Sequence, residues 1–417
     1  MGALRWAVPG RRGAHGRFVT DAFTLGRLPR IAFGEGRVAE LPAIVASHGS
    51  RALLVTGRSS FRRSVAWPTL LAGLAAAGVS VVADLLVERE PSPEVVDSAV
   101  GQFRMADVEV VVGIGGGSVL DAAKAIAVLL RADTTVMDHL EGVGRGLQYR
   151  GPAVPFVAVP TTAGTGSEAT RNAVLSRVGP DGFKKSFRDE ALVARDAIVD
   201  PALLAGLPPV AIASNGLDAL TQLLESLVST RSFSLSRALA RDGLAAARDG
   251  LVPWFRAAAA GADAPDARAR MAYAALLSGI CLAHTGLGAV HGLASPLGAR
   301  HPIGHGAACG ATLVAATRVN LAALDARDSD GPAAARYADA GRVLSGRSGL
   351  DDAAAREALV ETLEEWGSAL AVRSLAAFGV GESDFPPLIA DARGTSMRTN
   401  PIELTDGEVE AILRASL

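Results

Sequence analysis

The stretch VVVGIGGGSVLDAAKAIA, residues 110–127, sets the class of fold. It opens with β-branched residues, turns at Gly115, Gly116, Gly117 and Ser118, and continues with alanine-rich helical spacing. This pattern predicts a buried strand that turns directly into a helix. Glycines at such a turn let the backbone approach a pyrophosphate, and the helix N-terminus supplies free N–H groups. The stretch therefore indicates a dinucleotide site, although a tight turn without a ligand has the same spacing.

The flanking sequence repeats the alternation of strand and helix. A helix is predicted over 91–100, and further strands are predicted at 52–57, 79–87 and 154–162. Alternation of this kind predicts a parallel sheet with crossover helices. The segment 173–187 predicts a β-hairpin that turns around Pro180, Asp181 and Gly182.

Beyond Asp200 the β-rich runs stop, and Ala, Leu and Arg recur at helical spacing. We therefore expect a Rossmann-like parallel α/β domain at 21–200 and an all-helical domain at 201–417. The basic segment 1–20 has no continuous apolar run, so it predicts a flexible extension and not a secretion signal.

Composition narrows the partner and the compartment. The chain has 417 residues, a formal net charge of -2 and a sequence pI near 6.4, so no basic field would attract nucleic acid or a membrane surface. The apolar runs are short and interrupted, which predicts no membrane span. Only Cys281 and Cys309 are present, so we expect no disulfide framework. A small-molecule partner and a cytoplasmic location follow as expectations.

The end of the 52–57 strand is the position that usually recognises the adenosine ribose of a dinucleotide. Gly57 offers no carboxylate there, whereas the following Arg58, Ser59 and Ser60 could accept a 2′-phosphate. The cofactor is therefore NAD or NADP, and this segment favours NADP.

Two further features belong to the same expected site. The loop PTTAGTGSE at 160–168 offers the hydroxyls of Thr161, Thr162 and Thr165, which suit a ligand rich in acceptor oxygens. Asp121 and Lys124 follow the glycine turn at helical spacing. Basic residues in this chain are nearly all Arg, so either chance or a need for a compact ammonium retains Lys124.

Histidines gather in one span of the helical half, at His284, His291, His301 and His305. A cluster of this kind predicts metal ligands or proton donors. Upstream, Asp218 and Gln222 lie one helical turn apart in GLDALTQLLE, residues 216–225. A carboxylate and an imidazole at this spacing would form half of a metal site, but here the second residue is an amide.

Taken together, GGGSVLDAAK, PTTAGTGSEATRNAVL, DALTQLLE and GLGAVHGLASPLGARHPIGHG resemble the iron-containing, or group III, alcohol dehydrogenase family. The resemblance extends from about Arg30 to about Glu408. It implies a dinucleotide-binding α/β domain, a helical domain, a metal and substrate in the cleft between them, and a homodimer.

Carried over by position, the resemblance implies specific roles. It assigns pyrophosphate contacts to Gly115, Gly116, Gly117 and Ser118, other cofactor contacts to Thr161, Thr162 and Thr165, and the nicotinamide ribose to Lys184. It assigns the metal, Fe(II) first and Zn(II) or Mn(II) next, to Asp218, Gln222, His291 and His305. A further family histidine, associated with proton relay, falls on Ser295, and His301 could take that role.

The expected function is that of an NAD(P)-dependent alcohol dehydrogenase or aldehyde reductase with a metal-polarised carbonyl. Gln222 and Ser295 depart from the family pattern, and they leave three alternatives open. These are a metal-free reductase of an oxo acid that resembles maleylacetate reductase, a lyase that resembles dehydroquinate synthase, and a nucleotide-binding protein that has lost catalysis.

Overall fold

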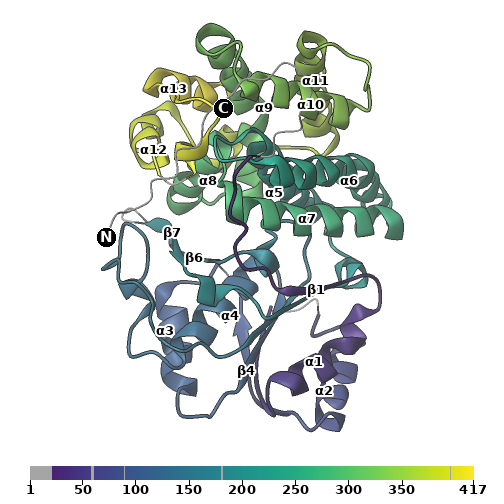
Figure 1. Cartoon of the computed structure of the whole chain (residues 1–417), viewed down its shortest axis with the longest axis vertical. Coiled ribbons are helices and arrows are strands. Elements are labelled where there is room, and N and C mark those ends of the chain that lie inside the picture. Colours follow the sequence, from purple (N-terminus) through teal and green to yellow (C-terminus); the bar gives the residue numbers. More distant parts are fainter. Residues whose placement is uncertain (1–20, 58–60, 89, 180–181, 395) are drawn as a thin grey trace, which may run out of the picture.

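The computed structural model describes residues 21–417 except 58–60, 89, 180–181 and 395. Its first half contains a six-stranded sheet whose order is β1-β8-β5-β4-β2-β3, with every paired strand parallel (Figure 1). The strands are β1 (Arg30–Phe33), β2 (Arg51–Gly57), β3 (Ser80–Val87), β4 (Val110–Gly115), β5 (Phe156–Pro160) and β8 (Asp196–Val199). The predicted parallel α/β architecture is confirmed.

Helices cover both faces of this sheet, which is why its central strands are apolar on both sides. They are α1 (Leu41–His48), α2 (Ala66–Ala76), α3 (Pro93–Phe103) and α4 (Gly117–Leu129). Leu53 of β2 packs in the cluster that contains α3 and α4, whereas its neighbour Leu54 packs in the cluster that contains α1 and α2. Ser92 is the N-cap residue of α3, and its side chain accepts a hydrogen bond from the Val95 N–H.

Strand β1, at one edge of the sheet, and its neighbour β8 were not predicted from the sequence. Each has four residues, and each opens with a charged residue, so neither has the apolar run that marked the central strands. Arg30 and Asp196 are in register in the parallel pair, and Arg30 Nε donates to Asp196 Oδ1 at 2.5 Å. Pairing with neighbouring strands, and not local composition, therefore defines these two elements.

The predicted hairpin is formed by β6 (Asn172–Arg177) and β7 (Phe183–Arg188), which pair antiparallel. The predicted turn residues Pro180 and Asp181 lie outside the described residues.

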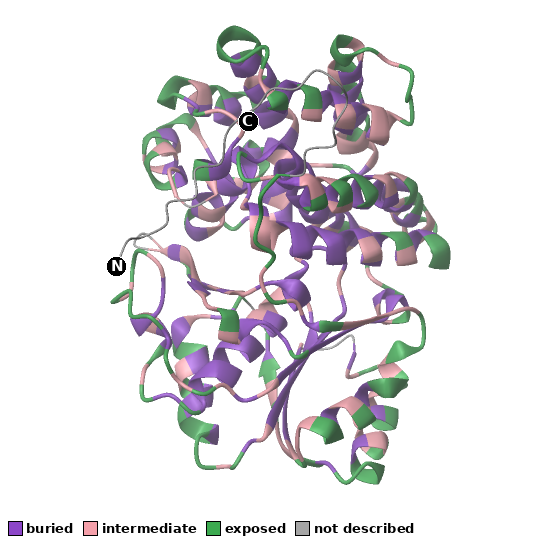
Figure 2. Ribbon diagram, viewed as in Figure 1, coloured by how far each residue is buried: buried purple, intermediate pink, exposed green. Residues whose placement is uncertain are grey.

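Beyond Asp200, every regular element of the described residues is helical, as predicted. The α-helices are α5 (Pro209–Val228), α6 (Ser234–Ala259), α7 (Pro265–Thr285), α8 (Ala289–Arg300), α9 (His305–Arg327), α10 (Pro332–Ser345), α11 (Asp352–Ala369), α12 (Phe385–Ala392) and α13 (Asp406–Ala415). Helix α9 is long and apolar enough to cross a membrane by composition, but 61% of its most apolar window is buried inside the fold. Figure 2 shows buried residues concentrated on the inner helices and the sheet.

The two halves meet through backbone contact. The loop after β5 leads into the short 3-10 helix η3 (Ser167–Ala169), which packs on α7. A Cβ added to Gly279 of α7 would lie 2.1 Å from the carbonyl oxygen of Gly166, and Gly166 has φ +59°. Only glycine allows these two segments to approach so closely, so their spacing is set by the main chain.

Candidate active site

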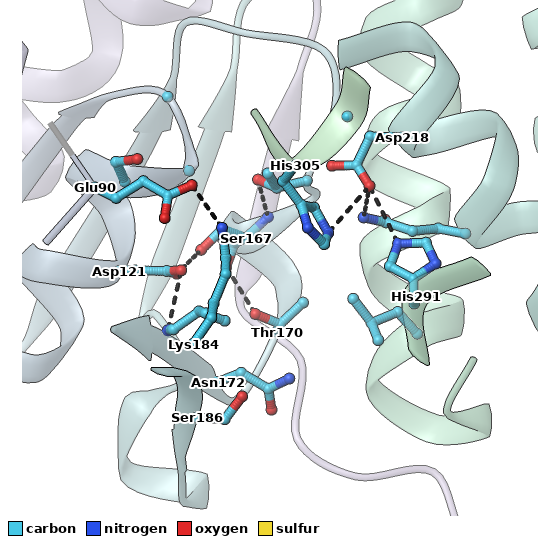
Figure 3. Close-up of a pocket in the computed structure, with 18 of the residues that line it drawn as sticks. Glu90, Asp121, Ser167, Thr170, Asn172, Lys184, Ser186, Asp218, His291 and His305 are labelled. Carbon is cyan, nitrogen blue, oxygen red and sulfur yellow. Dashed lines mark hydrogen bonds and ion pairs between the residues drawn. The ribbon is translucent and has the colours of Figure 1, made fainter. Parts of the chain in front are cut away.

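A cavity of about 440 Å³ lies between the two halves and receives side chains from both (Figure 3). One end is lined by the turn between β4 and α4, and the other by Asp218, His291 and His305. The carboxyl ends of parallel strands and the first turns of helices are where α/β proteins bind nucleotides. The cavity thus joins the predicted dinucleotide end to the predicted metal end.

The dinucleotide end is built largely from backbone. Strand β4 ends at Gly115, Gly116 is the extended N-cap residue, and α4 begins at Gly117. A Cβ at Gly117 would lie 2.7 Å from Thr165 Cγ2, so the loop after β5 closes directly over the turn. Of the predicted cofactor residues, the cavity is lined by Gly116, Gly117, Ser118, Asp121, Thr162, Thr165 and Lys184.

Of the other four predicted cofactor residues, Gly57, Gly115 and Thr161 do not line the cavity, and Ser59 lies outside the described residues. The Thr161 N–H donates to the Gly115 carbonyl at 2.9 Å, and neither residue lines the cavity. Gly57 ends β2 and does not itself line the cavity, but it lies beside Val119, which does.

Asp121 ties α4 to the loop and the hairpin. Its Oδ1 accepts from Ser167 Oγ at 2.6 Å, and its Oδ2 accepts from the Val174 N–H at 3.1 Å. Burial raises the pKa of the Asp121 carboxyl, although Lys124 nearby opposes the rise. Asp121 therefore fixes the wall beside the glycine turn.

Lys124 is fully buried behind that wall. Its Nζ donates to Thr170 Oγ1 at 2.8 Å and to the Asn172 carbonyl at 2.9 Å. A compact ammonium fits these acceptors, which supplies a structural reason for a lysine in a chain dominated by arginine. Burial lowers the pKa of Lys124 to about 8 and raises the pKa of the buried Glu168 carboxyl to about 7.

Lys184 is held in place on the hairpin side of the cavity. Its Nζ lies 2.5 Å from Glu90 Oε1, and Glu90 Oε2 accepts from Ser176 Oγ at 2.7 Å. Ser176 and Lys184 are register partners in the β6–β7 pair, so the hairpin presents both groups to the same carboxylate. Figure 3 shows Lys184 facing Glu90 across from the histidines.

The metal end is built from side chains of three helices. Asp218 comes from the middle of α5, His291 from the first turn of α8 and His305 from the first residue of α9. Asp218 Oδ1 lies 3.2 Å from His291 Nε2 and 3.7 Å from His305 Nε2, and the two rings approach it from different sides (Figure 3). Cys309, one turn along α9, has its Sγ 3.9 Å from Asp218 Oδ1.

Glu225 orients His291 from behind. His291 Nδ1 lies 2.7 Å from Glu225 Oε2, while Glu225 Oε1 accepts from the Val290 N–H at 2.7 Å. A carboxylate on one ring nitrogen fixes the tautomer and directs the other nitrogen toward a metal. Glu225 lies seven residues after Asp218 on α5. This spacing predicts that the two carboxylates share a helix face, but it does not predict that Glu225 contacts His291.

Gln222 lies beside Asp218, with its amide nitrogen toward the carboxylate. Gln222 Nε2 donates to Asp218 Oδ1 at 3.0 Å, and Gln222 Oε1 accepts from Ser278 Oγ at 2.7 Å. The amide oxygen, which is the only atom of this side chain that can ligate a metal, thus faces Ser278 of α7 and not the carboxylate of Asp218.

Burial and the neighbouring groups set the ionisation of the residues at this end. Burial opposes ionisation of Asp218, but His305 and His291 keep the pKa of its carboxyl below the ordinary value. Burial lowers the pKa of His305 to about 4, with Asp218 opposing only in part, so its ring is neutral. Burial also works against a charged His291, but Cys309, Asp218 and Glu225 outweigh it and raise the pKa of His291.

The two candidate proton-relay residues are separated. Ser295 lines the cavity one turn after His291. His301 follows the end of α8, does not line the cavity, and has its Nε2 3.7 Å from Asp384 Oδ2 beside α12. Because α8 ends before His301, its ring points to the α12 side, and the structure does not bring it to the site.

These residues fit a divalent metal. One ligand atom from each of Asp218, His291, His305 and Cys309 lies within 4.8 Å of all the others. In addition, His305 Nδ1 is buried without a hydrogen-bond partner in the described part of the chain. Two imidazoles and a carboxylate are a donor set for Zn(II), Fe(II) or Mn(II).

Comparison with known proteins places the chain in a family. The model "Iron-containing alcohol dehydrogenase" matches residues 29–201, and the model "Fe-containing alcohol dehydrogenase family, C-terminal" matches residues 212–417. Long-chain-alcohol dehydrogenase 1 of Geobacillus thermodenitrificans is 35% identical over 81% of this chain and 82% of its own length.

Solved structures agree with this result. An archaeal halo-thermophilic alcohol dehydrogenase from a Red Sea brine pool has a TM-score of 0.86 at 26% identity, covering 97% of this chain and 100% of its own. Sulfoacetaldehyde reductase of Bifidobacterium kashiwanohense, solved in complex with NAD+, has a TM-score of 0.80 at 26% identity, covering 94% and 98%. The chain belongs to the iron-containing alcohol dehydrogenase family, and the resemblance read from its motifs is confirmed.

Proposed function

We propose that this protein is a metal- and NAD(P)-dependent oxidoreductase that interconverts a small alcohol and its aldehyde. The observation that carries the proposal is the single cavity lined at one end by Gly116 and Gly117 and at the other by Asp218, His291 and His305. A nucleotide at the first end would extend toward the ligand cluster at the second. When bound, the metal would stabilise negative charge on the substrate oxygen and the cofactor would carry the hydride.

The chain's own groups prepare this chemistry before substrate arrives. The N–H groups of the first turn of α4 point to where phosphates would lie, and the Glu90 carboxylate holds Lys184 beside the nicotinamide end. Asp218, His291 and His305 would hold the metal, with Glu225 fixing the ring of His291. Leu282 and Leu287 add apolar surface to the cavity wall.

For the proton, we propose that the hydroxyl of Ser295 acts together with the cofactor ribose as the relay. Ser295 is the relay candidate that lines the cavity. It lies one turn after His291 on α8, and its Oγ is 3.5 Å from the His291 carbonyl. Replacing Ser295 with Ala should lower kcat without lowering metal content, which steady-state kinetics and metal analysis measure together.

For the cofactor, we propose that NADPH is accepted at least as well as NADH. Strand β2 ends at Gly57, which has no carboxylate to repel a 2′-phosphate or to bind a ribose 2′-OH.

A panel of short aldehydes tests the function as a whole. The chelator-treated protein is assayed with NADH and with NADPH, alone and with added Fe(II), Mn(II) or Zn(II). We expect nicotinamide oxidation that depends on an added metal. Turnover of an oxo acid that survives chelation would instead support the metal-free reductase, and cofactor binding without any turnover would refute an enzymatic role.

A further inference from the structure

The fourth side chain of the metal end is a thiol. Cys309 lies one turn after His305 on α9, and its Sγ is 3.8 Å from His291 Nε2 and 3.9 Å from Asp218 Oδ1. Zn–S, Zn–N and Zn–O bonds of about 2.0 to 2.3 Å place tetrahedral ligand atoms roughly 3.3 to 3.8 Å apart. The separations among Asp218, His291 and Cys309 are therefore already close to those of a ligand shell.

Gln222 is a poorer candidate for the fourth ligand. Its amide nitrogen, which cannot ligate, faces Asp218, and its oxygen accepts the hydroxyl of Ser278. Both ends of the amide are thus satisfied, so recruiting the oxygen to a metal would cost the hydrogen bonds that hold Asp218 and Ser278. In this arrangement Gln222 positions Asp218.

The Cys309 thiol lies on the core side of the site, opposite the face that opens to the cavity. Asp218, Gln222, His291 and His305 all line the cavity, whereas Cys309 is fully buried and does not. A ligand from the core side would complete the shell without blocking the face that opens to substrate. With four protein ligands, the position left for substrate is a fifth coordination position on the cavity face, since catalytic zinc can expand to five-coordinate.

We propose that Cys309 Sγ is the fourth protein ligand of this site, in the place that an imidazole at position 222 would take, and that the site consequently prefers Zn(II). Thiolate is a soft ligand that selects zinc over harder cations such as Mn(II). The inference rests on the proposed metal site. On binding, the S–H bond breaks as the S–metal bond forms, and the proton leaves to water.

Cobalt(II) is the probe, because a thiolate ligand gives Co(II) a charge-transfer band in the near ultraviolet that oxygen and nitrogen ligands do not give. The full-length protein is stripped with a chelator and titrated with Co(II) while the absorption spectrum and the bound metal are measured. We expect one cobalt per chain, with the charge-transfer band growing in proportion to occupancy.

Matched variants identify the sulfur. Cys309→Ser should abolish the band and lower Zn(II) affinity by at least about tenfold, with a smaller loss for Mn(II). Cys281→Ser is the control, because that thiol is buried in α7 and contacts the Ser236 carbonyl, so the band should persist. The double variant Gln222→His with Cys309→Ser should regain Zn(II) affinity without the band, which separates loss of a ligand from loss of folding.

The outcomes distinguish the two levels of the proposal. Cobalt uptake by the wild-type protein without a charge-transfer band, or a band that survives in Cys309→Ser, overturns the thiolate ligand and leaves the metal site standing. No uptake by the wild-type protein overturns both. A band that disappears in Cys309→Ser and persists in Cys281→Ser supports the assignment.

Discussion

The two ends of the cavity are built by different means. At the dinucleotide end, contiguous backbone from the β4–α4 turn and the loop after β5 makes the surface, and added side-chain atoms would collide there. At the metal end, side chains from α5, α8 and α9 make it, and the helices only supply positions. The first end should therefore be damaged by adding atoms, and the second by removing them.

The largest effect is expected from removing a ligand. His305→Ala should lower kcat/KM by at least about 10³-fold, because it removes a proposed ligand of the metal that would polarise the reacting oxygen. Cofactor affinity should stay unchanged. Steady-state kinetics, metal analysis and cofactor titration measure the three quantities. The control is His301→Ala, which lies by Asp384 and should retain activity. Unchanged turnover in His305→Ala would refute its role.

Glu168 lies in η3, where the two halves of the chain meet, and its replacement should affect stability. Its pKa is raised from 4.5 to about 7, so between these pH values the folded chain binds more protons than the unfolded chain. The wild-type protein therefore loses stability as pH rises through this window, by up to about 3 kcal/mol. Glu168→Gln should remove that loss.

Thermal unfolding of both proteins from pH 4.5 to above pH 7 tests this expectation. The variant should gain stability relative to the wild type as pH rises. Parallel profiles for the two proteins would show that Glu168 does not titrate in this way.

Adding one methyl group at the dinucleotide end should weaken cofactor binding and leave metal binding unchanged, whereas His305→Ala should do the reverse. In Gly117→Ala the new Cβ would lie 2.7 Å from Thr165 Cγ2, so the loop must move away from the phosphate position. We expect cofactor Kd to rise by about 10- to 100-fold while metal content is unchanged. Gly101→Ala, where no atom lies within 4 Å of the new Cβ, is the matched control. A fall in metal content would break the contrast between the ends.

The smallest effect is expected in cofactor choice. Gly57→Asp can be accommodated, since its Cβ would make an ordinary contact of 3.6 Å with Val119 Cγ2. A carboxylate at this position repels a 2′-phosphate and accepts from a ribose 2′-OH. The NADPH to NADH ratio of kcat/KM should fall by about tenfold. An unchanged ratio would show that the adenosine ribose does not bind beside position 57.

The same contrast explains what could be predicted from the sequence. The β4–α4 turn is local, so its strand, glycines and helix follow from adjacent residues. Asp218, His291 and His305 were recognisable through their motifs, and the structure brings them together. Glu225, Ser278 and Cys309 were missed because their roles depend on how α7, α8 and α9 pack on α5. The i+4 spacing of Cys309 from His305 was the one available signal.

His301 shows the opposite error. Its place in the histidine-rich span suggested a proton relay, but the sequence does not say that α8 ends at Arg300 and directs the next ring toward Asp384. The structure brings together Asp218, His291 and His305, which belong to helices, and does not bring His301, which follows a helix end, to the same site.

The contact of Gly166 with Gly279 has a consequence for how the enzyme could diversify. Since main chain meets main chain there, no side-chain rotamer can change the spacing between the loop after β5 and α7. Changes in substrate size would therefore have to come from side chains of the cavity wall, such as those of Leu282 and Leu287, and not from a change in the distance between the two halves.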